Sequence, residues 1–190
     1  MKNFAFKSVI SLFCLAFLVC FAAPNSANAQ RRDYMTEPES EIVRESQEID
    51  LRIMVLTKMI DRRFAILSNE QIKPEKNSDR WGEPPTGTRL ELLSDINKLL
   101  QKAIDDIDDV AAHNRMDSKL FPKAMRNLAE AAARYQLKIK AIFDQNPSNL
   151  EKGLLLGASE FCDTIIEAAA KVPKEAPKEE KKKKKKNDTK

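Results

Sequence analysis

Four aspartates in one short stretch are the residues whose type and spacing are best suited to chemistry, because carboxylates bind cations and accept protons. They end the patterned segment TRLELLSDINKLLQKAIDDIDDVAAH and are Asp105, Asp106, Asp108 and Asp109. At helical spacing Asp106 lies at the flank of an apolar stripe, and the other three face away from it. Like charges three or four residues apart repel one another, and a helix C-terminus favours cations. The cluster therefore needs an explanation.

Two interpretations of the aspartates compete. In the structural one, Asp106 pairs with Arg52 or Arg63 of another helix, and the other aspartates form a solvated face, as most charged side chains do. In the functional one, Asp105 and Asp109, one helical turn apart, offer oxygen ligands to Ca²⁺, Mg²⁺ or a cationic partner. Rigid helical spacing without a loop of carbonyls disfavours tight binding, so we do not predict a metal site.

Histidine and cysteine are too scarce for the common catalytic and metal-binding devices. The chain has one histidine, His113, and three cysteines, of which Cys14 and Cys20 precede the mature protein proposed below and Cys162 remains. A His/Cys zinc site needs three or four ligands, a di-iron bundle needs paired Glu-x-x-His motifs, and c-type haem needs C-x-x-C-H. Four glycines leave no nucleotide-binding glycine loop. We therefore expect a protein without enzymatic activity, cofactor or bound metal.

The only tryptophan, Trp81, lies in the segment SNEQIKPEKNSDRWGEPPTG, residues 68–87. The prolines and glycines of this segment cannot continue a helix, and such a long loop is usually functional or mobile. One interpretation is that the Trp81 ring folds back and plugs one end of the helical body, since a large apolar ring normally seeks burial. The other is an exposed aromatic platform for a glycan or peptide.

Four amphipathic segments must position these residues. Apolar side chains recurring at three- and four-residue steps predict helices over residues 36–67, 88–113, 118–142 and 148–169. Capping boxes are predicted at two of the helix starts, from Thr36 to Glu39 and from Ser148 to Glu151. The fold class is all-α, an antiparallel up-down four-helix bundle with a long loop between its first two helices and a disordered basic tail.

The apolar stripes of the four helices should share one core. The predicted core comprises Ile49, Ile53, Leu56, Ile60, Leu93, Ile96, Leu100, Ile107, Leu128, Ile139, Phe161 and Ile165. Arg52 and Arg63 lie at the edge of the first stripe, which makes them candidate partners in ion pairs between helices. Gly153 and Gly157, four residues apart, would let a neighbouring backbone approach closely, and we expect this neighbour to be a helix of the same chain, with a dimer face as the alternative.

Residues 1–29 have the features of a cleaved secretory signal peptide. Lys2 and Lys7 precede an apolar run over residues 9–23, and an A-x-A site ends at Ala29. The run is short for a transmembrane span, so we expect cleavage and export to the periplasm or the extracellular space, with retention as an anchor as the alternative. The mature chain then keeps one cysteine and forms no intrachain disulfide. Residues 30–172 would form the helical body.

A lysine-rich tail, residues 173–190, follows a mildly acidic body. It has little apolar content to bury and should be disordered. Its run of six lysines comprises Lys181, Lys182, Lys183, Lys184, Lys185 and Lys186. Such a run either solvates the tail or contacts an anionic partner.

These features predict an exported, envelope-associated interaction or structural module whose lysine run contacts an anionic envelope polymer, a surface or an acidic protein. Export argues against nucleic acid as the partner. The alternative is a bundle that binds a ligand or divalent cation, or an enzyme, using the Trp81 loop and the Asp105–Asp109 face. The sequence leaves the oligomeric state open.

Overall fold

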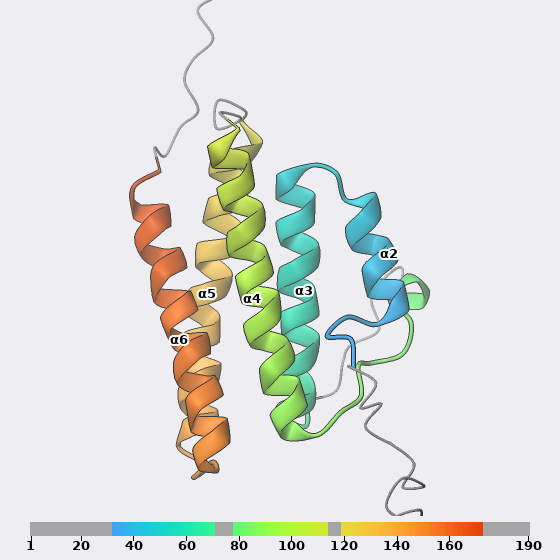
Figure 1. Ribbon diagram of the computed structural model, residues 1–190, viewed down its shortest axis with the longest axis vertical. Helices are drawn as coiled ribbons and strands as arrows, with labels where there is room; N and C mark the ends of the chain where they lie inside the picture. Colours follow the sequence, from blue (N-terminus) through green and yellow to red (C-terminus); the bar gives the residue numbers. More distant parts are fainter. Residues whose placement is uncertain (1–31, 71–77, 114–118, 173–190) are drawn as a thin grey trace, which may run out of the picture. The chain divides into compact units, whose positions relative to one another are not determined.

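The computed structural model describes residues 32–70, 78–113 and 119–172, and over these ranges the chain is all-α (Figure 1). The elements are α2 (Glu37–Glu45), α3 (Ile49–Leu67), the short 3-10 helix η1 (Ser78–Trp81), α4 (Arg89–Ala112), α5 (Leu120–Phe143) and α6 (Asn149–Ala170). All of them belong to one unit that begins at Tyr34. None of the described helices is both long and apolar enough to span a membrane. The predicted signal peptide and lysine run lie outside the described residues.

Three of the described helices begin with a capping box. In each, a hydroxyl accepts the backbone N–H three residues on, and the glutamate there accepts the N–H of the capping residue. The predicted boxes at Thr36 and Ser148 are confirmed, and Thr88 with Glu91 forms a third at the start of α4. These helix starts are therefore encoded locally.

The first predicted helix is two helices, so the prediction of one continuous helix over residues 36–67 is wrong. The break follows Glu45, where the Ser46 N–H and hydroxyl both donate to the Ile42 carbonyl, at 3.1 and 2.8 Å. Such serine bonds compete with helix continuation. The Ser46 carbonyl in turn accepts Arg52 Nε at 2.9 Å. The chain reverses direction here, and α2 lies beside α3 (Figure 1).

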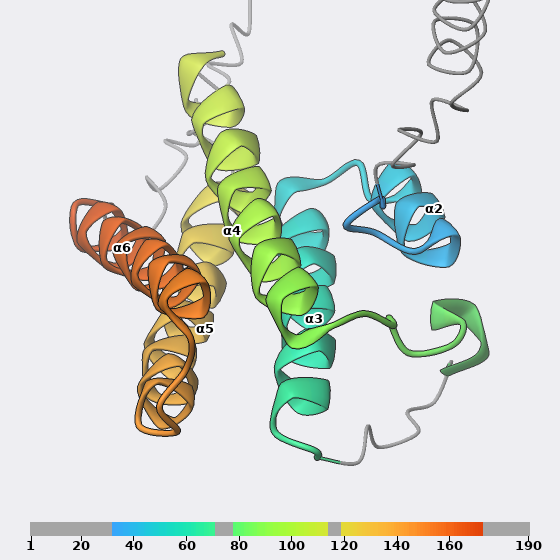
Figure 2. The same ribbon diagram turned by 60° about the horizontal axis from the view of Figure 1, so that its bottom comes forward.

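The four longer helices pack in the cyclic order α3, α4, α6, α5. Successive helices run in opposite directions, as Figures 1 and 2 show. However, α4 and α5 hardly touch although they are consecutive, because they lie diagonally across the core. As a result α3 and α5 are side by side and parallel, as are α4 and α6.

Ion pairs along the α3–α5 contact follow this parallel alignment. The acidic partners lie on α3 or just after it, the basic partners lie on α5, and both series ascend together: Asp50 with Lys123 at 2.7 Å, Asp61 with Arg134 at 3.6 Å, and Glu70 with Lys138 at 3.4 Å. Each of the three pairs has one partner that is more than half exposed, so each contributes little stability.

The core lies between α3, α4, α5 and α6, and its predicted composition is confirmed with one shift. Eleven of the twelve predicted residues are buried, whereas Phe161 is only half-buried. The inward face of α6 is centred on Leu155, Ala158, Cys162 and Ile165, so Cys162 takes the place expected for Phe161. Tyr135 is fully buried too, and its hydroxyl donates to the Thr57 carbonyl at 2.8 Å.

Gly157 allows α4 and α6 to approach closely, whereas Gly153 has no such role. A Cβ at Gly157 would lie 2.9 Å from Asn97 Oδ1, while a Cβ at Gly153 would have no neighbour within 4 Å. Asn97 Nδ2 donates to the Leu154 carbonyl of α6 at 2.9 Å. Only one of the two predicted glycines is therefore needed for helix packing.

Candidate functional site

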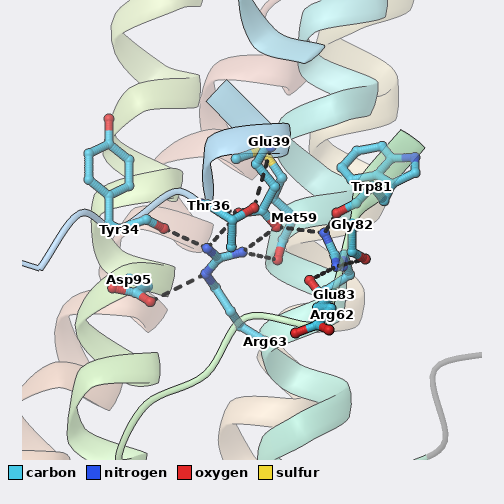
Figure 3. A network of polar contacts seen from close by, with 10 residues as sticks. All are labelled: Tyr34, Thr36, Glu39, Met59, Arg62, Arg63, Trp81, Gly82, Glu83 and Asp95. Atoms are coloured by element: carbon cyan, nitrogen blue, oxygen red, sulfur yellow. Dashed lines mark hydrogen bonds and ion pairs between the residues drawn. The ribbon is translucent and has the colours of Figure 1, made fainter. Parts of the chain in front are cut away.

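Two consecutive arginines of α3, Arg62 and Arg63, are buried, with 6% and 1% of their surface exposed. Neighbours on a helix point about 100° apart, so the two side chains diverge. Arg63 points toward α4, and Arg62 points toward the segment after η1 (Figure 3). Burying a charge is costly unless it is paired and hydrogen-bonded, so their partners define the site.

Glu39 is the shared partner of both arginines and is fully buried. Its Oε1 accepts Arg62 Nη1 at 3.0 Å and Arg63 Nη1 at 3.1 Å, and its Oε2 accepts Arg63 Nη2 at 2.8 Å. The Thr36 N–H also donates to Oε2, at 3.0 Å, as part of the capping box of α2. The helix start that the sequence encodes therefore also aims Glu39 at α3.

Arg62 holds the loop that follows η1. It donates to the carbonyls of Trp81, Gly82 and Glu83 at 3.0, 3.2 and 2.7 Å (Figure 3). Gly82 has a φ of +60°, and a Cβ there would lie 2.8 Å from Pro38 Cγ of α2. Glycine is thus required both by the backbone conformation and by the close approach of the loop to α2.

Arg63 connects α3 to the segment before α2 and to α4. It donates to the carbonyls of Met59 and Tyr34, at 2.9 and 2.5 Å. Its Nε lies 3.5 Å from Asp95 Oδ2 of α4, an ion pair without a hydrogen bond. We call Glu39, Arg62, Arg63 and Asp95 the buried ion cluster.

The hydrogen bonds and ion pairs of the buried ion cluster connect elements of the fold. Burial lowers the pKa of Arg62, opposed by Glu39 and reinforced by Arg63, but an arginine still remains protonated. Each Glu39 oxygen already accepts two donors, which fills the lone-pair sites of the carboxylate. The carboxylate therefore has no free site from which to take a substrate proton.

Trp81 lies against the side of α3 and does not plug an end of the helical body. Its ring is half-buried against the core, with Lys58 Nζ 4.6 Å and the Arg62 guanidinium 5.6 Å from the ring centroid. These are cation–π distances. The Trp81 ring is therefore partly buried, as expected. Its predicted position at an end of the helical body is wrong, because the ring lies beside Lys58 and Arg62 of α3 and the η1 helix that carries it contacts α2.

Asp106 lies in a second, separate cluster. Its Oδ1 is 2.6 Å from Lys102 Nζ and 3.8 Å from Arg52 Nη1 of α3. Of the two arginines suggested by the sequence, Arg52 lies near Asp106, whereas Arg63 binds Glu39 and Asp95 instead. Arg52 and Arg62 are ten residues apart on α3, roughly 15 Å along its axis. The contacts of Asp106 and of Trp81 therefore lie in different parts of the fold.

Asp105 and Asp109 lie on the solvent side of α4. Asp105 accepts Gln101 Nε2 at 2.7 Å, and Asp109 Oδ1 lies 3.3 Å from Nδ1 of His113. Within the described ranges no group of three or more His, Cys, Asp or Glu side chains is placed to hold a metal ion. The structure thus does not bring the Trp81 loop and the aspartates into one site.

The sequence did not predict three members of the buried ion cluster: Glu39, Arg62 and Asp95. The capping box accounts for a glutamate at position 39, so the sequence contains no separate sign that Glu39 also binds Arg62 and Arg63. Asp95 lies three residues after Leu92 and four before Leu99, both buried. A charge at a core-facing position of an apolar stripe was the available signal. Arg62 gave no comparable signal.

Lys181 to Lys186 lie outside the described residues, so the structure says nothing of their surroundings. Comparison of the chain with protein-family models, with curated proteins and with solved structures gave no match.

Proposed function

We propose that this protein is an exported, non-enzymatic interaction or structural module of the cell envelope, whose lysine run binds an anionic polymer or surface. The observation that carries the proposal is the run of six lysines, Lys181–Lys186, at the end of the chain. It follows a helical body whose most deeply buried ions, in the buried ion cluster, bind one another. The body is thus organised for stability, and the tail offers the concentrated charge.

We further propose that α3, α4, α5 and α6 constitute a four-helix bundle to which α2 and η1 are attached. The shared core and the cyclic contacts of the four helices support this description. In this view the buried ion cluster attaches α2 and the loop at 81–83 to the bundle. The bundle would then serve as a carrier that presents the tail.

Binding through the lysine run should be electrostatic and therefore sensitive to salt. By analogy with single-stranded nucleic acid, each neutralised charge contributes roughly −0.7 to the slope of log affinity against log salt. Six lysines would then give a slope of about −4. Affinity should fall steeply as the salt concentration rises.

The experiment measures binding of the chain from Gln30 onward to phosphatidylglycerol vesicles at several salt concentrations. A variant with all six lysines replaced by glutamine should lose most binding, and a matched variant with six arginines should keep it, because the charge is unchanged. Equal binding by the glutamine variant and the parent, or binding indifferent to salt, would refute the proposal. Phosphatidylcholine vesicles, which carry no net charge, serve as the lipid control.

A further inference from the structure

The outer side of the α5–α6 pair has a groove of about 320 Å³. Ile139 and Leu155 line it as buried residues, while Phe143 and Leu156 line it with 38% and 60% of their surface exposed. In Figures 1 and 2, α5 and α6 lie together at the edge of the helical unit away from α2. Exposed large apolar side chains beside a groove raise the question of what could cover them.

Leu156, at the rim of the groove, also lies midway along α6 between two side chains of opposite charge that do not line the groove. Lys152, Leu156 and Glu160 are spaced four residues apart, so they lie in one row with about 6 Å between neighbours. Nearby charges are used internally, Glu151 with Arg89 at 3.0 Å for example, but within the described residues neither Lys152 nor Glu160 forms an ion pair. The row is thus a cation, an exposed leucine and an anion.

We propose that a second copy of this chain occupies the groove, in a two-fold contact in which the two α6 helices cross antiparallel at Leu156. A two-fold axis there places Lys152 of each copy opposite Glu160 of the other, and it brings the two Leu156 side chains together at the rims of the two grooves that they line. Two-fold contacts use the same patch on both subunits, and a patch must complement itself to do so. A row in the order positive, apolar, negative is complementary to the same row running in the opposite direction, so this patch can pair with its own copy.

This charge pattern favours a second copy over other occupants. A purely basic or purely acidic segment would satisfy one end of the row and be repelled by the other. A wholly apolar segment would leave both charges without partners. The two ion pairs are exposed, and such pairs contribute little each, so the dimer should be weak and concentration-dependent.

Sedimentation velocity of the chain from Gln30 onward, from about 1 µM to about 1 mM, tests the proposal. The expected result is a reversible shift from one copy to two. Leu156→Asp should weaken association by about tenfold or more, since it removes the apolar centre and adds two like charges. Leu51→Asp is the matched control, because Leu51 is also exposed, at 42%, but lies on α3. It should associate as the parent does.

Charge reversal supplies the decisive comparison. Lys152→Glu or Glu160→Lys alone should each weaken the dimer by about tenfold, because two opposite-charge pairs become like-charge pairs. The double variant K152E/E160K restores opposite charges in reversed order and should recover affinity to within about threefold of the parent. A parent that stays monomeric throughout, a double variant no better than the single ones, or association unaffected by Leu156→Asp would each overturn the proposal.

Discussion

Replacement of Glu39 by glutamine tests whether the buried ion cluster holds α2 against α3. Glutamine keeps the shape of the side chain and also suits the third position of a capping box, but it lacks the negative charge, and its amide nitrogen donates where a carboxylate oxygen of Glu39 accepts two hydrogen bonds. Arg62 and Arg63 would then remain buried with one carboxylate in the cluster, that of Asp95, 3.5 Å from Arg63 Nε.

The expected loss is about 3 kcal/mol, the lower end of the cost of removing one member of a buried ion pair. The lower end applies because five backbone carbonyls and Asp95 still interact with the two arginines. α2 has nine residues, too few for stability alone, and the one apolar side chain that it buries fully is Ile42. That burial stabilises α2 by roughly 1.5–3 kcal/mol. The Glu39 charge therefore matters as much as the apolar contact, and α2 should open before the rest unfolds.

Amide hydrogen exchange resolves this local opening from global unfolding. In the Glu39→Gln variant, exchange within α2 should accelerate about a hundredfold, the equivalent of about 3 kcal/mol, while α5 stays near its parental rates. Glu41→Gln is the matched control, since Glu41 lies on the same helix but forms an exposed pair with Arg44, at 2.6 Å. Exchange in α2 within about threefold of the parent would show that the buried ion cluster does not hold this helix.

Three further predictions concern the core and the α4–α6 contact. Leu100→Ala should lower the free energy of unfolding by about 2–5 kcal/mol in urea titrations, because Leu100 is fully buried, and an unchanged midpoint would contradict this. Gly153→Ala should stabilise the protein by about 1 kcal/mol, because alanine has the higher helix propensity and its Cβ meets no neighbour. Gly157→Ala should bring no such gain, because the new Cβ would displace the Asn97 side chain. Equal melting temperatures of the two variants would refute this prediction. Burial raises the pKa of the Cys162 thiol to about 12, so iodoacetamide at mildly alkaline pH should label the unfolded chain only. Because the raised pKa favours the neutral thiol, its contribution to stability is complete below the unfolded pKa of about 8.5 and is lost as the pH rises toward 12.

The sequence by itself determined the helical class, most helix ends and nearly all of the core. These features depend on local rules: hydroxyl and glutamate three residues apart cap a helix, and apolar side chains at three- and four-residue steps define its inward face. The prediction failed locally at Ser46, where a serine bond to the preceding turn ends α2 although the apolar stripe continues. Periodicity reports the face of a helix but not its continuity.

Only the tertiary structure decided which charges meet. Arg52 and Arg63 were equivalent on the first stripe, yet Arg52 lies near Asp106 and Arg63 binds Glu39. The reversal of the chain after Glu45 brings Glu39 back against α3, and no local pattern encodes that return. Likewise, the diagonal placement of α4 and α5 makes α3 and α5 parallel neighbours. Pairing between distant side chains depends on how helices are arranged around the core, because helical periodicity gives a side chain its direction and not its partner.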